Sequence, residues 1–137
     1  MNDSFSKVLI IHGNSQEILA SAIILSRIGP QVHLASQGGG GLEMAETYDF
    51  DLIVLADDLE DFSPEEVLDR LSRENRSLTL VVLSKPMDEN DIRTKFSEAL
   101  DVFESPQVPM KMVATICEHL IKNFECQNEM IPQLIIN

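Results

Sequence analysis

Four acidic side chains and a phenylalanine are crowded into one short stretch of the chain: Asp57, Asp58, Glu60, Asp61 and Phe62. The wider segment 49–66 contains eight acidic residues and no basic one. Carboxylates mixed with an apolar ring are typical of a docking surface for a basic protein, because opposite charges steer and align the encounter. The alternative is a solvated acidic loop. We take these five residues as candidates for partner binding.

His12 is the other residue with chemistry of its own, since histidine titrates near neutral pH. It follows a β-branched run, and open α/β sheets bind ligands at the carboxyl ends of their strands. His12 with Asp57 or Asp58 could begin a metal site. Metals normally need three or four ligands, however, and these residues do not supply that number. The chain shows no nucleophile paired with a base. We therefore expect no metal, no cofactor, no catalytic residue and no enzyme.

Four consecutive glycines, residues 38–41, lack the lysine and the spacing of a phosphate-binding loop. They precede a predicted short helix and raise its ordering cost by roughly 0.5–1 kcal/mol each relative to alanine. We expect a mobile second helix, which either adapts to a partner or is a loose corner of the fold.

Composition limits the kind of protein that must position these residues. The 137 residues are 44% hydrophobic and 24% charged, as in a single globular domain. The formal net charge of −13 excludes a broad basic face for nucleic acid and disfavours an anionic membrane. No apolar run approaches the roughly 20 residues of a membrane helix, and no signal-peptide pattern is present. We expect a cytoplasmic protein.

Strand and helix signals alternate along the chain. Short β-branched or apolar runs predict five strands, at 7–11, 31–35, 51–56, 78–83 and 100–103. Helix signals follow each strand, with capping residues at Ser63 and at Asp88 or Asn90, a helix from there to about Ala99, and a last helix from Pro109. This alternation predicts one doubly wound α/β domain, (βα)5, with a parallel sheet in the flavodoxin-like order 2-1-3-4-5.

Several of these segments also match a known family in order and gap length. They are the run 8–11, the lead-in 48–55, the apolar pair Val67-Leu68, the pair Leu83-Ser84, and Ser105-Pro106 ahead of Pro109. Over residues 7–123 the chain resembles a CheY-like receiver domain of a bacterial response regulator. The resemblance implies two-component signal transduction, in which a phosphorelay transfers phosphoryl to an aspartate beside Mg²⁺.

The residues at the positions of that phosphorylation pocket have largely changed. The resemblance places His12 and Gly13 where the family has its acidic pair, and Ala56 where it has the acceptor aspartate. Ser84 matches the hydroxyl position, whereas Ser105 replaces the lysine. Without carboxylates for Mg²⁺ and a lysine for the phosphoryl oxygens, this implies a pseudo-receiver. Asp57 becomes the acceptor only if a bulge turns it inward.

We divide the chain into a receiver-like domain, 1–124, and an apolar extension, 125–137. The extension carries Met130, Ile131, Leu134, Ile135 and Ile136. Apolar surface of this kind marks interfaces, so a homodimer through the last helix and tail is one expectation. The region around Val102 and Phe103 is a second partner-binding candidate.

Three functions stay open at this point. The first is a stand-alone pseudo-receiver that signals by phosphorylation-independent protein binding. The second is a phosphorelay receiver that uses Asp57 in an unusual site. The third is a small flavodoxin-like ligand binder or enzyme, since a fold alone does not fix a function.

Overall fold

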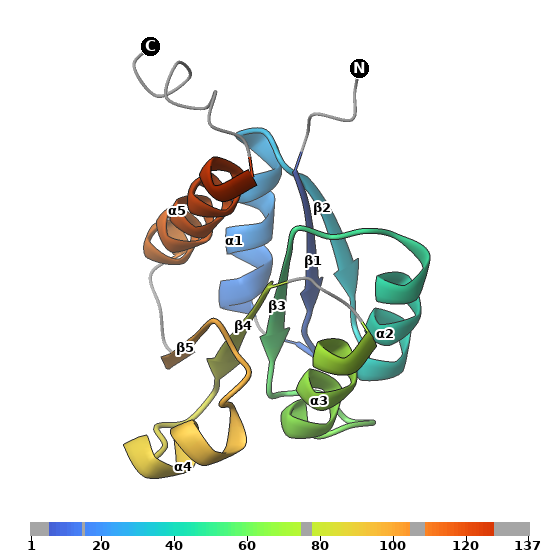
Figure 1. Ribbon diagram of the computed structural model, residues 1–137, viewed down its shortest axis with the longest axis vertical. Helices are drawn as coiled ribbons and strands as arrows, with labels where there is room; N and C mark the ends of the chain where they lie inside the picture. The colour runs from blue at the N-terminus through green and yellow to red at the C-terminus, as the bar shows by residue number, and fades with distance from the viewer. Residues whose placement is uncertain (1–5, 15, 75–77, 105–108, 128–137) are drawn as a thin grey trace.

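The computed structural model describes residues 6–14, 16–74, 78–104 and 109–127. Its centre is a five-stranded parallel sheet in the order β2-β1-β3-β4-β5 (Figure 1). The strands are β1 (Lys7–Ile11), β2 (Gln31–Ala35), β3 (Leu52–Ala56), β4 (Leu78–Leu83) and β5 (Asp101–Glu104). Both the parallel sheet and its order confirm the predicted fold class.

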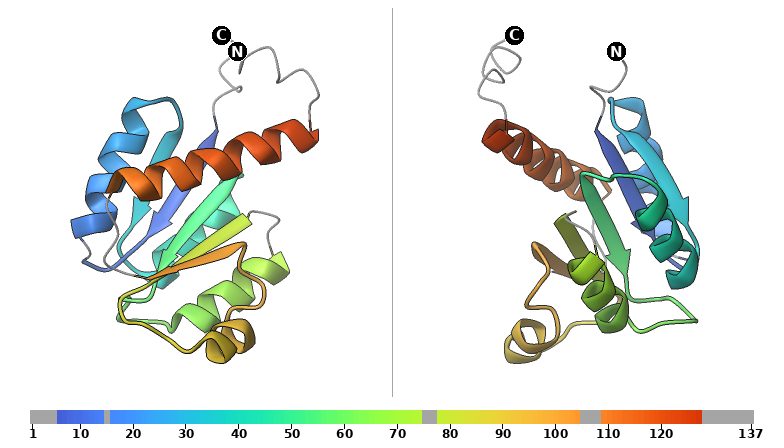
Figure 2. Two further views of the ribbon diagram at one scale, coloured as in Figure 1. Left: turned by 90° about the vertical axis from the view of Figure 1, so that its left-hand side faces the viewer. Right: turned by 45° about the vertical axis from the view of Figure 1, so that its right-hand side comes forward.

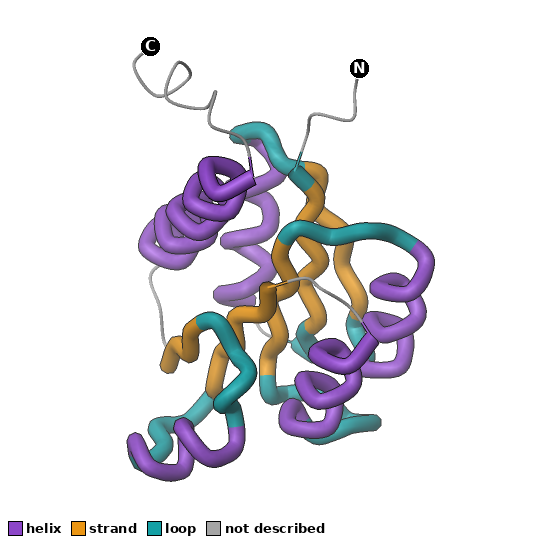
Figure 3. Tube along the Cα trace, in the orientation of Figure 1, coloured by secondary structure: helices purple, strands orange, loops and turns teal. Residues whose placement is uncertain are grey.

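Helices cover both faces of this sheet (Figure 2). They are α1 (Gln16–Arg27), α2 (Gly38–Thr47), α3 (Pro64–Glu74), α4 (Glu89–Lys95) and α5 (Pro109–Gln127). Helices α1 and α5 pack together on one face, whereas α2 and α3 lie on the other. The alternation of helices and strands along the tube is clear in Figure 3. None of the described helices is long and apolar enough to cross a membrane.

Two apolar clusters, one on each face, hold the layers together. The central strand β3 is buried along its whole length and contributes to both clusters, because its side chains alternate between the faces. Val54 and Ala56 lie in the cluster beneath α1 and α5, whereas Ile53 and Leu55 face α2 and α3. A strand buried on both faces explains the uninterrupted apolar run that predicted it.

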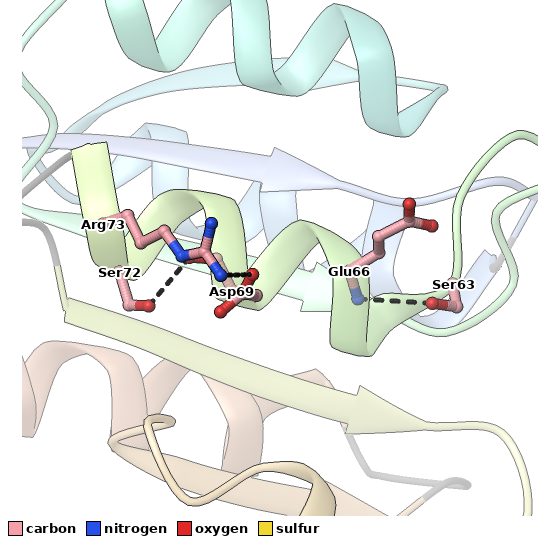
Figure 4. A network of polar contacts seen from close by, with 5 residues as sticks. All are labelled: Ser63, Glu66, Asp69, Ser72 and Arg73. Carbon is pink, nitrogen blue, oxygen red and sulfur yellow. Dashed lines mark hydrogen bonds and ion pairs between the residues drawn. The ribbon is translucent and has the colours of Figure 1, made fainter.

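Helix α3 begins where the capping pattern predicts. Ser63 directly precedes Pro64, the first residue of the helix. Its Oγ accepts a hydrogen bond from the Glu66 N–H at 3.2 Å (Figure 4). Further along, Arg73 pairs with Asp69 at 2.9 Å on the exposed side of the helix. The opposite side buries Val67, Leu68 and Leu71 against the sheet.

The glycines at the head of α2 have a packing role. Gly41 is buried, and a Cβ there would overlap the side chain of Ile11. A Cβ on Gly38 would lie 2.9 Å from the ring of Phe62. The absence of side chains therefore lets α2 approach β1 and the loop after β3 closely.

The structure differs from the sequence expectations near the β5 edge. Helix α4 ends at Lys95 rather than near Ala99, because Phe96 leaves the helical conformation and is buried. Strand β5 runs from Asp101 to Glu104, one residue later than expected. Asp88 is the N-cap of α4, and its carboxylate accepts from the Asn90 N–H at 3.1 Å.

Candidate functional site

The candidate site lies at the carboxyl ends of the strands, where the loop after β3 meets its neighbours. Ala56 is the last residue of β3, is buried, and pairs with Val82 of β4. The Asp57 N–H donates to the Val82 carbonyl at 3.1 Å and so continues the β3–β4 pairing by one step. The first position with a carboxylate at this strand end is therefore Asp57, while Ala56 belongs to the core.

Asp57 is half-buried and turned toward β4. Its carboxylate accepts from the Ser84 N–H at 2.9 and 3.0 Å and from Ser84 Oγ at 3.2 Å. Asp57 and Ser84, which the resemblance assigned to the degenerate phosphorylation pocket, thus lie in direct contact. Both oxygens of the carboxylate are occupied by Ser84, so this contact ties the loop after β3 to the loop after β4.

Asp58 makes the corresponding contact on the other side, with the loop after β1. Its two carboxylate oxygens accept from the Gly13 and Asn14 N–H groups, each at 2.8 Å. A Cβ at Gly13 would overlap the Asp58 carbonyl oxygen, so the loops touch only because residue 13 is glycine. The close contact of the two loops therefore explains why residue 13 is a glycine.

Asp61 repeats the pattern at the start of α2. Its carboxylate accepts from the Gly38 and Gly39 N–H groups, each at 2.9 Å. The Gly39 N–H, and with it the Gly38 N–H, holds the pKa of the Asp61 carboxyl below its usual value against the opposing effect of desolvation. Anions are stabilised in this position by the unpaired N–H groups of a helix start.

We call Asp57, Asp58 and Asp61 together the carboxylate clamp. The three residues lie in one loop and bind the backbone after β4, β1 and β2, respectively. Phe62 is held beside them, since the guanidinium of Arg70 lies 4.9 Å from its ring centroid. From the sequence these acids were candidates for partner contact, and the clamp was not predictable, because the backbone N–H groups that they bind are the same at every residue.

His12 and a small hollow complete this end of the sheet. The His12 N–H donates to the Ala35 carbonyl at 3.0 Å, and its half-buried ring leaves Nδ1 without a hydrogen-bond partner among the described residues. Nearby, Asp58 and Glu60 line a hollow of about 210 Å³. The described part of the chain holds no group of three or more metal-ligating side chains.

The second candidate region divides between the two faces of the sheet. Val102 lines a shallow hollow of about 480 Å³ between α4 and β5, together with Ile92, Phe96 and Arg93. Phe103 points to the opposite face and packs on the cluster beneath α1 and α5. Ser105 and the tail 128–137 lie outside the described residues, and α5 continues past residue 124 to Gln127.

Comparison with known proteins shows which class has this fold. No family model and no curated protein matches the chain. A CheY-like receiver domain from Methanospirillum hungatei is similar, with a TM-score of 0.78 and 22% identity over 89% of this chain and 98% of its own. Chemotaxis protein CheY4 of Vibrio cholerae gives a TM-score of 0.72 and 19% identity, over 84% and 98% of the two chains.

A further similar structure is the BeF3-activated receiver domain of DrrB, a Thermotoga maritima response regulator. It has a TM-score of 0.70 and 18% identity, over 85% of this chain and 97% of its own. The protein therefore has the fold of CheY-like response-regulator receiver domains. At these identities the likeness establishes the fold, and the chemistry has to be argued from the residues of this chain.

Proposed function

We propose that this protein is a pseudo-receiver, a signalling module that binds protein partners without being phosphorylated. The observation that carries the proposal is the hydrogen bonding of Asp57 and Asp58. Both carboxylates at the end of β3 are occupied by N–H groups of neighbouring loops, and His12 and Gly13 offer no carboxylate in their place. Mg²⁺ is bound through carboxylate oxygens, so at Asp57 or Asp58 it would compete with these N–H groups for the same oxygens.

Two surfaces of the molecule are candidates for binding the protein partner. The loop 57–62 keeps Glu60 exposed beside Phe62, and the strong negative charge of the chain favours a partner with a basic surface. The hollow between α4 and β5 adds an apolar floor from Ile92, Phe96 and Val102, with Arg93 and Asp101 at its margin. Apolar floors with charged margins are the usual composition of protein interfaces.

An amide NMR titration with Mg²⁺ and beryllofluoride tests the proposal. We expect no saturable shifts at millimolar concentrations, because the loop after β1 supplies no carboxylate to share Mg²⁺ with Asp57. The DrrB receiver domain, which has been solved in its BeF3-activated form, is the positive control in the same buffer. Saturable shifts centred on Asp57 and Ser84 would contradict the proposal.

A phosphorelay receiver that uses Asp57 is the second candidate, and one observation favours it. Asp57 lies 3.2 Å from Ser84 Oγ, and the resemblance gives a hydroxyl at this position the role of binding phosphoryl oxygens. On this alternative, Mg²⁺-dependent labelling by a small phosphodonor such as acetyl phosphate disappears in Asp57→Ala and persists in Asp58→Ala. Labelling that survives Asp57→Ala excludes it.

A further inference from the structure

Strand β2 leaves one edge of the sheet open. Among the described residues it pairs with β1 alone, and the Gln31 N–H donates to the Ser6 carbonyl while the Ala35 carbonyl accepts from the His12 N–H. Because successive residues of a strand turn their polar groups to opposite sides, the N–H and C=O groups of Val32 and Leu34 point away from β1. They form a short row of hydrogen-bonding groups along the outer side of β2, the edge strand of the sheet (Figure 1).

The two edges of the sheet differ in charge. Strand β5 begins with Asp101 and ends with Glu104, and charges of this kind protect an edge from pairing with another chain. Strand β2 reads Gln-Val-His-Leu-Ala and contains neither an acidic residue nor a lysine or arginine. In a chain with a net charge of −13, β2 is therefore the edge strand whose own side chains add least repulsion toward a second acidic molecule.

Apolar side chains flank this edge on the α1 side. Leu34 is 45% exposed although it lies on the same side of β2 as the half-buried Val32. On α1, Ile24 is half-buried and packs on the core, whereas Leu19 and Ile23 are exposed on the other flank. Helix α1 lies against both α5 and β2, and by helical spacing Leu19 and Ile23 lie on a different flank of α1 from Ile24. We infer that this exposed flank is the one toward the β2 edge.

An aromatic group flanks the same edge on the α2 side. The ring of Tyr48, which is 45% exposed, lies 5.5 Å from the ring of His33, and His33 in turn packs edge-on against buried Phe50 at 5.3 Å. Strand β2 therefore presents uncharged, partly apolar side chains above and below its free backbone groups.

We propose that this edge pairs with β2 of a second copy of the chain, antiparallel, about a two-fold axis at His33. In that register Val32 faces Leu34 of the other copy, and the outward N–H and C=O groups of both residues form four hydrogen bonds. Leu34, Leu19 and Ile23 of the two copies then cover one another. A second copy fits better than a basic partner because the edge has no charge to complement, and one strand pairing with itself satisfies a two-fold interface.

The pairing buries few residues, so the dimer is weak and reversible, with an expected Kd of about 10–100 μM. Sedimentation velocity across that range of concentration measures it. We expect Leu34→Lys to raise the Kd at least tenfold, because it replaces an apolar contact by two like charges roughly 8 Å apart across the pairing. Ile121→Lys, at a residue of similar exposure on α5, is the matched control and should change the Kd less than twofold.

This pair of variants also separates the proposal from the dimer through the last helix and tail that the sequence suggested. If Ile121→Lys abolishes association and Leu34→Lys does not, the β2 pairing is wrong. A wild-type chain that stays monomeric throughout the range also overturns it. Circular dichroism establishes that both variants are folded, which the exposure of the two sites leads us to expect.

Disulfide trapping provides a second, positive test. In a Cys117→Ser, Cys126→Ser background, His33→Cys places two thiols opposite each other at the axis, with Cα atoms about 4.5 Å apart, which a disulfide can bridge. In the same register two copies of Leu34→Cys lie roughly 8 Å apart, too far for a disulfide. Rapid cross-linking of His33→Cys alone supports the register. Equal cross-linking of the two, or none, overturns it.

Discussion

Aspartates 57, 58 and 61 share a role that their crowding in the sequence does not suggest. Each turns its carboxylate toward N–H groups of a neighbouring loop, at 2.8 to 3.0 Å. Hydrogen bonds to a charged acceptor are stronger than neutral ones. The acidic loop is therefore held against the sheet by its own charges, and Glu60 is the member of the group that lies outside the clamp and faces solvent.

The Asp58 contact predicts a measurable loss of stability. We expect Asp58→Ala to lower the free energy of unfolding by about 1–2 kcal/mol, because it leaves two N–H groups of the β1–α1 loop without their acceptor. Urea denaturation measures the change. Glu60→Ala is the matched control and should stay within about 0.5 kcal/mol of wild type. Equal effects of the two substitutions would show that the clamp does not stabilise the fold.

The lowered pKa of Asp61 predicts the sign of a pH effect. Since the folded-state pKa lies below the unfolded value, Asp61 stabilises the fold above its unfolded pKa, and this contribution is lost as pH falls through the folded-state pKa. A carboxyl-detected NMR titration should therefore give Asp61 a pKa below 3.8. In Asp61→Asn, stability should fall less on acidification than in wild type. A titration at or above the usual value would contradict the contact with Gly38 and Gly39.

At the level of elements, the limits of sequence reasoning can be seen in particular residues. Local signals predicted the starts of α3 and α4, because Ser63 and Asp88 cap them through contacts within three residues. The end of α4 was not predictable in this way, since Phe96 leaves the helix to be buried against residues distant in the chain. The four glycines predicted a mobile α2 from local propensity alone. Their packing on Ile11 is a contact between residues distant in the chain, so the sequence could not show it.

The glycines of α2 give a matched pair of substitutions. Gly41→Ala should lower the free energy of unfolding by about 1–3 kcal/mol, because its Cβ would overlap Ile11 and overpacking outweighs the better helix propensity of alanine. Gly40→Ala meets nothing within 4 Å, and should raise stability by roughly 0.5–1 kcal/mol. Urea denaturation of both proteins checks the pair. Two changes of the same sign would mean that α2 does not approach β1 this closely.

For the whole molecule, the fold was predictable and the site only partly so. The alternation of strand and helix signals predicted the parallel sheet, and β3 gave the clearest of these signals because it is buried on both faces. The strand order was predicted as the usual one for such doubly wound folds. The sequence placed Asp57 and Ser84 in one pocket, and they do meet. The sequence could not show that the Ser84 backbone N–H binds Asp57, because backbone groups are the same at every residue. For the same reason it could not show that Asp58 approaches residue 13 so closely that only glycine fits there.

The excess of negative charge predicts how the whole molecule responds to salt. Repulsion among 23 acidic residues opposes the compact state. Raising NaCl from about 10 to 200 mM shortens the screening length to below about 10 Å, so the melting temperature should rise. Sucrose of equal osmolality is the control for effects that do not depend on charge. A melting temperature that is insensitive to NaCl would show that local contacts already compensate this repulsion.

The four glycines that begin α2 also bear on the order in which the chain folds. A helix with glycine in its first turn nucleates poorly, since each glycine costs about 1 kcal/mol relative to alanine. The N–H groups of this turn are bound by Asp61, and its packing surface is Ile11. We expect both partners to be in place only after β1 and β3 have paired, so that α2 completes the fold rather than starting it. Folding chains should then pass through a stage in which the face of the sheet that α2 covers is still exposed.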